Sequence, residues 1–467
     1  MRQRWLSTCV IGLAAWGCVN GSDDSGTSPD DTGTGYTNNI SGNGNQAGSG
    51  SVGMAGSSSN PAGGSASGVA GSGSVPGAAG NVPVAGSTVA GGSASGGGTS
   101  SGGATTGGSA GSGNGPIEGG TGNVETNPGK GNGFFPATLL PSHAKTAYTT
   151  WKSKYLKMCS ATRYRVASNG EETVSEGIGY GMLLTVAHGD RAELDGLWGY
   201  YKDHSSGGVM GWKASGCGNN TVDGNSASDA DLDAAMALIQ AACKWGGNYL
   251  GEAQTLIAAI KSNETIEGGE NFLKPARQGL DSCQNVSYAA PGYYRAFAKK
   301  KPDQASFWNK LATDSYAQLA RTANGSTGLV PNWSNMSGGG GCAGKPNGDR
   351  YGYDAARTPW RVATDYVWNG TPAAKDWLGK VVTWVDGPAG GITAIGDMYQ
   401  LNGTKESPNH NSTFTGAFAL AAMSQSKAKA DQYGTAFRAI SDGSYFEESL
   451  RAVYMLLASG LFLNACD

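Results

Sequence analysis

Three acidic stretches of this sequence have a spacing that could support catalysis. In the first, TVSEGIGYGMLL at residues 173–184, Glu176 stands at the entrance to an apolar run and is followed by closely spaced glycines. An acid that lies against a substrate needs neighbours without side chains, so the pattern indicates that these glycines let a ligand approach Glu176. The alternative is an ordinary helix start, with Ser175 as the capping residue and Glu176 at the positive end of the helix dipole.

The second stretch, NSASDADLDAAMALIQAACKW, places Asp229, Asp231 and Asp233 at alternate positions just before a helical pattern. The spacing resembles the start of a calcium loop. However, Ala234 stands where an EF-hand needs Gly, and Gln240 stands where it needs a bidentate Glu. Calcium binding is therefore a weak interpretation, and helix capping accounts for one of the three carboxylates.

The third stretch, DRYGYDAARTPWRVATDY, contains Tyr353, Asp354 and Arg357. If a helix begins here, Asp354 and Arg357 share a face and form an ion pair. Such a pair keeps the carboxylate ionised. An ionised carboxylate held by Arg and flanked by Tyr is also what a general base acting on water requires.

The elements that must position these residues have the apolar spacing of helices. Loops rich in Gly, Asn, Pro and Ser separate the helical patterns, and alternating strand patterns are scarce. A series of helices in one large domain predicts an all-α fold, either a closed toroid of helix hairpins or an α-solenoid. The absence of a fixed repeat period argues against the solenoid. The helical patterns cover residues 179–189, 232–247, 253–262, 291–300, 307–323, 361–370, 374–385, 413–426 and 449–464.

Composition divides the 467 residues unevenly. Residues 1–18 combine two arginines with a short apolar segment, as in an export signal. The sequence LAAWGC is typical of a bacterial lipoprotein cleavage site, with Cys18 acylated at the cell surface; simple secretion is the alternative. Residues 19–131 are dominated by Gly, Ser, Ala, Thr and Asn, which predicts a disordered linker. Residues 132–467 carry most of the aromatic residues and can form one large core.

Charge and cysteine content limit the classes of partner. The formal net charge is only −3, so nucleic acid and anionic membranes are poor partners, and a membrane is expected only through the lipid at Cys18. The four scattered histidines do not form a zinc cluster, and no cofactor or metal is expected. An exported domain can form disulfides, but the sequence leaves their pairing open. The cysteines concerned are Cys159, Cys217, Cys243, Cys283, Cys342 and Cys466.

Four segments in order resemble successive signatures of glycoside hydrolase family 8: SEGIGYGM, ASDADLDAAMALIQAACKW, YGYDAARTPWRVATDY and NHNSTFTGAFALAAM. The similarity extends over residues 132–467. It implies an (α/α)6 barrel with a substrate cleft at one end. It also implies an inverting hydrolase of β-1,4-linked glycans, which in this family are cellulose, mixed-linkage glucan, xylan and chitosan.

The resemblance also implies roles for individual residues. Glu176 of the SEG motif would be the proton donor, and Asp229, the first Asp of ASDAD, would contact the sugar at the cleavage point. Asp354 of YDAAR would be the base, with Tyr353 and Arg357 orienting it and the water. A base at this position favours glucan or xylan over chitosan.

Several aromatic residues are expected to contact substrate. The resemblance implies stacking platforms at Trp212 and Tyr288 and a further substrate contact at Tyr180; buried core aromatics are the alternative. The stretch LKPARQGLDS lacks a Trp that endoglucanases of the family tend to carry, and Phe446 stands where a Tyr is common. Fewer platforms argue against long crystalline cellulose as the substrate.

The sequence therefore predicts a monomeric, endo-acting β-1,4-glucanase whose partner is a β-1,4-linked polysaccharide. Xylanase and chitosanase are the alternatives within the family. A non-catalytic surface protein that holds glycan chains in the same cleft is the alternative from another class, and the presence of both carboxylates in their motifs argues against it.

Overall fold

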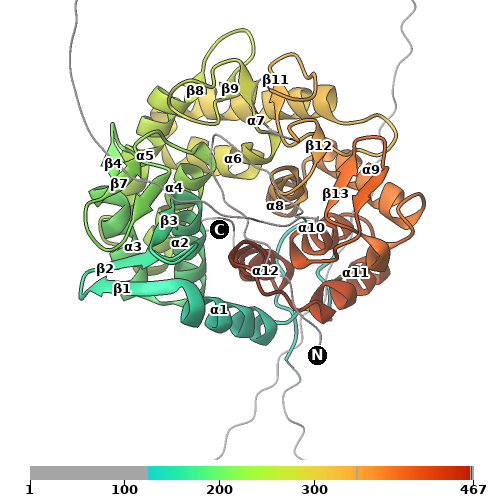
Figure 1. Ribbon diagram of the computed structural model, residues 1–467, viewed down its shortest axis with the longest axis horizontal. Coiled ribbons are helices and arrows are strands. Elements are labelled where there is room, and N and C mark those ends of the chain that lie inside the picture. The colour runs from blue at the N-terminus through green and yellow to red at the C-terminus, as the bar shows by residue number, and fades with distance from the viewer. Residues whose placement is uncertain (1–124, 343–344, 346, 463, 465–467) are drawn as a thin grey trace, which may run out of the picture. The chain divides into compact units, whose positions relative to one another are not determined.

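Twelve α-helices dominate the part of the chain that the computed structural model describes, residues 125–342, 345, 347–462 and 464 (Figure 1). The predicted export signal with Cys18, most of the predicted linker, and Cys466 lie outside these residues. No helix within them has the length and apolarity needed to cross a membrane. The helices are α1 (Pro141–Tyr155), α2 (Ser175–His188), α3 (Arg191–Asp203), α4 (Ser228–Trp245), α5 (Tyr249–Glu264), α6 (Pro291–Lys300), α7 (Ala305–Thr322), α8 (Thr358–Asn369), α9 (Pro372–Asp386), α10 (Ser412–Ala422), α11 (Lys427–Ala439) and α12 (Tyr445–Ala458).

The even-numbered helices form an inner ring. Each packs against the next in chain order, and α12 packs against α2, which closes the ring (Figure 1). The odd-numbered helices lie outside: α3, α5, α7, α9 and α11 each pack on the helix before them, and α1 packs on α12. Because both faces of an inner helix meet protein, α10 is buried along its whole length and α2 from Ser175 to Val186.

The glycines of α2 serve this close packing. A Cβ atom at Gly179 would lie 3.0 Å from both the carbonyl oxygen of Ala230 and Cβ of Asp233 on α4. At Gly177 it would collide with the hydroxyl of Tyr445. The expectation that these glycines let a ligand approach Glu176 is therefore wrong, because α4 and α12 occupy the space that their missing side chains leave.

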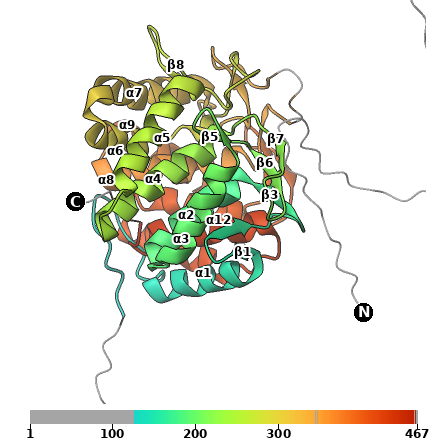
Figure 2. The ribbon, with the colours of Figure 1, turned by 90° about the vertical axis from the view of Figure 1, so that its left-hand side faces the viewer.

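Short strands occupy the connections between helices, a feature that the sequence did not indicate. The largest sheets have three strands, in the orders β3-β6-β7 and β12-β13-β14, and β3, β6 and β7 lie together at one end of the helices (Figure 2). The strands are β1 (Leu156–Ser160), β2 (Arg163–Val166), β3 (Glu172–Val174), β4 (Ser205–Ser206), β5 (Val209–Met210), β6 (Lys213–Ser215), β7 (Thr221–Asp223), β8 (Thr265–Ile266), β9 (Phe272–Leu273), β10 (Cys283–Gln284), β11 (Ser334–Asn335), β12 (Arg350–Tyr351), β13 (Met398–Gln400) and β14 (Lys405–Ser407).

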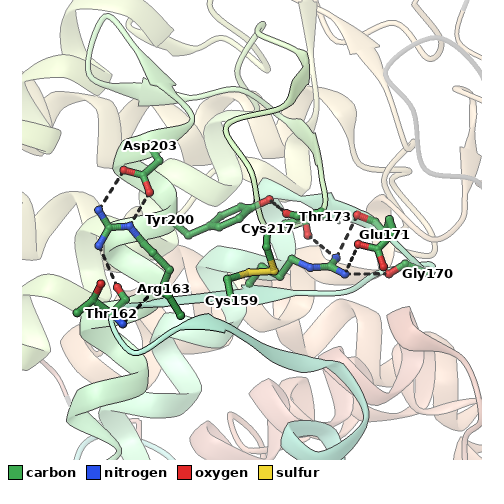
Figure 3. Close-up of a disulfide and its surroundings, with 12 residues drawn as sticks. Cys159, Thr162, Arg163, Gly170, Glu171, Thr173, Tyr200, Asp203 and Cys217 are labelled. Atoms are coloured by element: carbon green, nitrogen blue, oxygen red, sulfur yellow. Dashed lines mark hydrogen bonds and ion pairs between the residues drawn. A yellow bond between two sulfur atoms is a disulfide. The ribbon is translucent and has the colours of Figure 1, made fainter.

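Two disulfides join these connections. Cys159 on β1 is bonded to Cys217, which follows β6 (Figure 3). Cys283 on β10 is bonded to Cys342, which lies after β11. The two bonds span 58 and 59 residues of sequence, so each closes a loop of nearly the same length.

Residues 125–136, the N-terminal strap, cross the C-terminal ends of three inner helices. The side-chain amide of Asn127 donates to the carbonyl of Ala458 at the end of α12, at 2.7 Å, and to two further carbonyls. Backbone N–H groups of Asn132 and Phe134 donate to carbonyls at the ends of α8 and α10. The boundary placed at residue 132 therefore falls inside a segment that is bonded to the helices.

Candidate active site

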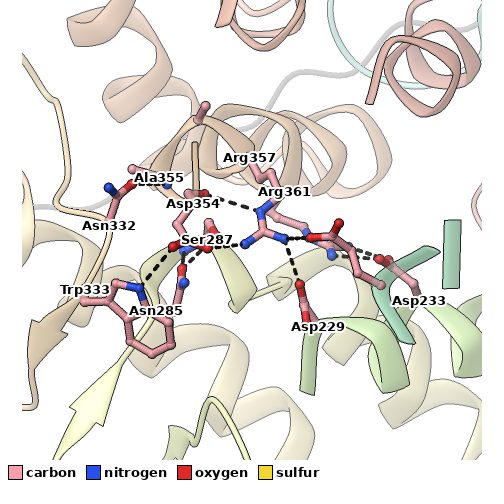
Figure 4. A network of polar contacts seen from close by, with 12 residues as sticks. Asp229, Asp233, Asn285, Ser287, Asn332, Trp333, Asp354, Ala355, Arg357 and Arg361 are labelled. Carbon is pink, nitrogen blue, oxygen red and sulfur yellow. Dashed lines mark hydrogen bonds and ion pairs between the residues drawn. The ribbon is translucent and has the colours of Figure 1, made fainter. Parts of the chain in front are cut away.

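The predicted catalytic residues lie at the N-terminal ends of inner helices, and Figure 4 shows two of them, Asp229 and Asp354, beside Arg357. Glu176 is the second residue of α2 and Asp229 is the second residue of α4. Asp354 precedes and Arg357 ends a single 3-10 turn, Ala355–Arg357, that leads directly into α8. Ser175 does not cap α2, because Val174 takes the capping position and Ser175 is already helical.

Arg357 joins the three predicted acids. Its Nη1 donates to Glu176 Oε2 and to Asp229 Oδ2, the latter at 2.8 Å, while Nη2 donates to Asp354 Oδ1 at 2.8 Å. All four side chains are buried, with exposed fractions of 2% for Arg357 and Asp229, 7% for Asp354 and 9% for Glu176. The predicted ion pair between Asp354 and Arg357 is confirmed, and the same guanidinium reaches two further helices.

Asp354 has donors for both carboxylate oxygens. Besides Arg357 at Oδ1, the indole Nε1 of Trp333 donates to Oδ2 at 3.0 Å. Asn332 fixes the backbone around this residue, since its Oδ1 accepts from the N–H groups of Gly352 at 3.0 Å and Ala355 at 2.9 Å. Sequence reasoning missed Trp333 and Asn332, for which the only signal was a lone Trp in a loop.

The neighbouring Asp233 belongs to a separate ion pair. Arg361 holds it through two hydrogen bonds of 2.6 and 2.9 Å, and both side chains are buried. Asp231 faces away from both, toward the hydroxyl of Tyr201 and the N–H of Met210. The three alternate aspartates thus have three different sets of partners, and none of them caps α4.

Three carboxyl groups share the single charge of Arg357, so ionising all three would leave two uncompensated negative charges. Burial raises the pKa of Glu176 to about 8; Arg357 opposes this rise, and Asp229 and Asp354 add to it. Burial also raises the pKa of Asp229. Glu176 is therefore protonated at neutral pH, although it lies beside a guanidinium.

The separation of Glu176 and Asp354 follows from their shared partner. Each accepts from a different nitrogen of one guanidinium, so the two bonded oxygens lie no more than about 8 Å apart. This limit includes the ~5 to 5.5 Å between the carboxyls of a retaining glycosidase and the lower part of the ~6.5 to 9.5 Å of an inverting one, so it does not choose between the two mechanisms.

Two predicted platforms lie beside these acids. The ring of Tyr288 lies 5.1 Å from Cζ of Arg357 and meets Trp333 edge to face. Trp212 packs in a small cluster with Val174 and Tyr445 next to the start of α2. Both predicted platforms are mostly buried, so each offers only an edge or a small part of its ring.

Tyr353 and Tyr180 lie in different surroundings. The hydroxyl of Tyr353 donates to Asp397 Oδ2 at 2.7 Å and accepts from Asn411 at 3.2 Å, so Asp397 and Asn411 engage this hydroxyl. Its ring is half-buried and meets Phe446 edge to face. Tyr180 is fully buried one turn below Glu176, which leaves it no surface to offer to a sugar. The structure does not support a direct substrate contact for Tyr180.

Comparison with known proteins identifies the family. Residues 137–460 match the sequence profile of Glycosyl hydrolases family 8. The chain belongs to this family. Family 8 relatives include Endoglucanase A of Acetivibrio thermocellus, 38% identical over 68% of this chain and 69% of the relative. Endoglucanase 2 of Ruminiclostridium josui is 35% identical over 68% of this chain and 71% of the relative.

Solved structures agree with the family. A β-1,3-1,4-glucanase from Paenibacillus sp. X4 superposes with a TM-score of 0.67 and 28% identity, covering 73% of this chain and 97% of the other. A family 8 xylobiose complex from Teredinibacter turnerae superposes with a TM-score of 0.63, covering 70% of this chain and 95% of the other. At 20% identity, the second likeness concerns the fold alone.

Several buried polar atoms of this family 8 site have no hydrogen-bond partner among the described residues. Within the described residues, no hydrogen-bond partner lies near Ser175 Oγ, Glu176 Oε1, Asp229 Oδ1 or Trp212 Nε1, although all four atoms are buried. Buried polar atoms are normally hydrogen-bonded, so these four are available to pair with a bound ligand, as are other unpaired atoms elsewhere among the described residues. A sugar ring, which carries both donors and acceptors on its hydroxyls, matches this mixed set.

Proposed function

We propose that the protein is an endo-acting, inverting hydrolase of β-1,4-glycosidic bonds in glucan, either cellulose or mixed-linkage glucan. The observation that carries this proposal is the pair of carboxyl groups held in different environments by one guanidinium. Endoglucanases among the family 8 relatives at 33 to 38% identity and a Beta-glucanase of Niallia circulans at 31% support glucan as the substrate.

The environments assign the two roles. Glu176 serves as the acid, because burial keeps it protonated at neutral pH and one of its oxygens has no competing partner. Asp354 serves as the base, because Arg357 and the indole N–H of Trp333 each hold one of its carboxylate oxygens in a fixed position. Asp229, bound to the same guanidinium nitrogen as Glu176, would contact the sugar at the cleavage point.

The rest of the architecture fits this proposal. We take the ring of even-numbered helices, each with an outer partner, as an (α/α)6 barrel with its cleft at the end where α2, α4 and α8 begin. Export, by a leader at residues 1–18 with or without lipid at Cys18, is supported by the disulfides, which form in oxidising compartments. A monomer is proposed.

Reducing-sugar release from carboxymethylcellulose, barley mixed-linkage glucan, xylan and chitosan tests the substrate. Faster release from the two glucans supports the proposal, and faster release from xylan or chitosan replaces it with the corresponding activity. Binding without release would make the protein a glycan-binding module. Proton NMR in the first minutes of hydrolysis tests the mechanism, because inversion at a β-linkage gives the α-anomer first.

A further inference from the structure

Trp333 donates its indole N–H to the carboxylate proposed as the base. The distance from Trp333 Nε1 to Asp354 Oδ2 is 3.0 Å, and Arg357 occupies the other oxygen. The preceding residue, Asn332, accepts from two backbone N–H groups that flank Asp354. One dipeptide therefore fixes both the backbone and the carboxylate of Asp354, while Arg357 fixes the remaining oxygen.

The ring of Trp333 has no free surface for a sugar. Its exposed fraction is 5%, the ring of Tyr288 meets it at a centroid distance of 6.2 Å, and the ammonium of Lys345 lies 4.6 Å from its centroid. A stacking role is thus excluded by burial. What Trp333 offers to the site is its N–H group, held in one direction by the packing of its ring.

The Cys283–Cys342 disulfide anchors the segment that carries Trp333. The N–H of Gly341, next to Cys342, donates to the carbonyl of Trp333 at 2.8 Å. On the other side, Cys283 pairs with Asn335 in the β10–β11 ladder, two residues beyond Trp333. The disulfide therefore joins two segments that are both bonded to the chain at Trp333–Asn335, one at Trp333 and the other at Asn335.

We propose that Trp333 is a positioning residue for Asp354, and that the Cys283–Cys342 disulfide keeps its N–H directed at the carboxylate. The role rests on the proposed function of Asp354 as the base. The N–H bond fixes the direction in which the carboxylate faces the water, so its loss slows the chemical step more than it weakens glycan binding. The other charged groups near Asp354 are Arg357, Lys345, Glu176 and Asp229.

Trp333→Phe removes the N–H and keeps an aromatic ring. We expect kcat on barley glucan to fall by roughly 10- to 100-fold, as for a hydrogen bond to a charged group, with KM nearly unchanged. Trp377→Phe is the matched control, since Trp377 also donates a buried N–H, to the carbonyl of Gly328 at 3.0 Å, on the outer helix α9. It should lower stability and leave both kcat and KM nearly unchanged.

The two disulfides give a second matched pair. Replacing Cys283 and Cys342 by Ser, or Cys159 and Cys217 by Ser, opens loops of nearly equal length, so the chain-entropy contribution to stability should be similar. Only the first pair of substitutions should lower kcat. Adding Trp333→Phe to that variant should cost less than the two separate effects combined, because both act on one hydrogen bond.

Equal kinetic effects of the two disulfide variants would overturn the proposal. So would a Trp333→Phe enzyme whose kcat and KM match those of Trp377→Phe. Wild-type protein that hydrolyses none of the glycans would instead refute the proposed function. In that case the carbon NMR signal of the Asp354 carboxyl still tests the hydrogen bond from Trp333. This signal is identified by its loss in Asp354→Asn. It should move in Trp333→Phe and stay in Trp377→Phe, and an unchanged signal in both would refute the hydrogen bond.

Discussion

Replacing Glu176 by Gln should have opposite effects on activity and on stability. Burial raises the pKa of this carboxyl from 4.5 to about 8 in the folded protein. A raised folded-state pKa means that the folded protein binds the proton more tightly than the unfolded chain. The resulting stability is fully present below pH 4.5 and is lost as the pH rises toward 8. Gln keeps the shape of the protonated acid but does not titrate, so Glu176→Gln should escape this loss.

The magnitude follows from the same shift. At 1.36 kcal/mol for each pKa unit, the change from 4.5 to about 8 corresponds to about 5 kcal/mol between pH 4 and pH 9. This is an upper limit for the gain of the variant, because Arg357 loses an anionic neighbour above pH 8. We therefore expect Glu176→Gln to match the wild type near pH 4 and to exceed it by up to this amount at pH 9.

Denaturant unfolding at a series of pH values measures the stability difference, and reducing-sugar release measures turnover. Turnover on an unactivated glucan should fall by roughly 10²-fold or more, as expected for loss of a general acid. A stability difference that does not grow with pH would refute the burial of a protonated Glu176. Near-normal turnover would refute its role as the acid, whatever the stability shows.

Asp354→Asn should abolish turnover and leave glycan binding nearly unchanged, as measured by titration calorimetry, and lost binding would contradict a role confined to water activation. Burial raises the pKa of Glu264 well above its usual range and that of its neighbour Asp231 to about 6, so this pair stabilises the fold at low pH and loses that contribution as the pH rises. Glu264→Gln should therefore have a higher unfolding free energy than the wild type at pH 8 to 9 and a similar one at pH 4. An unfolding free energy below that of the wild type at high pH would contradict this prediction. Asn127→Ala should lower the unfolding free energy by about 1 to 3 kcal/mol through four lost hydrogen bonds, with kcat unchanged. A chain that begins at residue 132 should lose a similar amount of unfolding free energy and therefore melt at a lower temperature than the full chain. An equal melting temperature would show that the removed part of the strap adds nothing to stability.

The helices that the sequence revealed are those with broad apolar surfaces. The patterns at 232–247 and 413–426 correspond to α4 and α10 of the inner ring, which are buried on most sides. Three outer helices, α1, α3 and α11, were not predicted. Helix α1 buries only Ala144, Tyr148 and Trp151. The sequence pattern of such a narrow apolar stripe is hard to distinguish from that of a polar loop. At the C-terminus, Gly460 with a φ of +74° follows soon after α12 ends at Ala458, short of the predicted 464.

The candidate site was predictable where its chemistry lies in local motifs. Asp354 and Arg357 are three residues apart, so their pairing follows from helix geometry alone. The contacts of Asp354 with Trp333 and of Tyr353 with Asp397 join segments 21 and 44 residues apart. No spacing rule relates such segments. The glycines of α2 were misinterpreted for a similar reason, since a short side chain suits an approaching helix as well as an approaching ligand.

The direction of the inner helices links the site to the opposite end of the ring. The carboxylates lie at the N-terminal ends of α2, α4 and α8, where the helix dipoles favour negative charge by ~0.3 to 1 kcal/mol each. This contribution offsets part of the cost of placing three carboxyl groups around Arg357. At the other end, the last carbonyls of α8, α10 and α12 need donors, and the strap supplies N–H groups from Asn127, Asn132 and Phe134. Because the helices share one orientation, negative charge is favoured at one end of the ring, and unpaired carbonyls need hydrogen-bond donors at the other. The strap can therefore contribute to stability without contacting any residue of the candidate site.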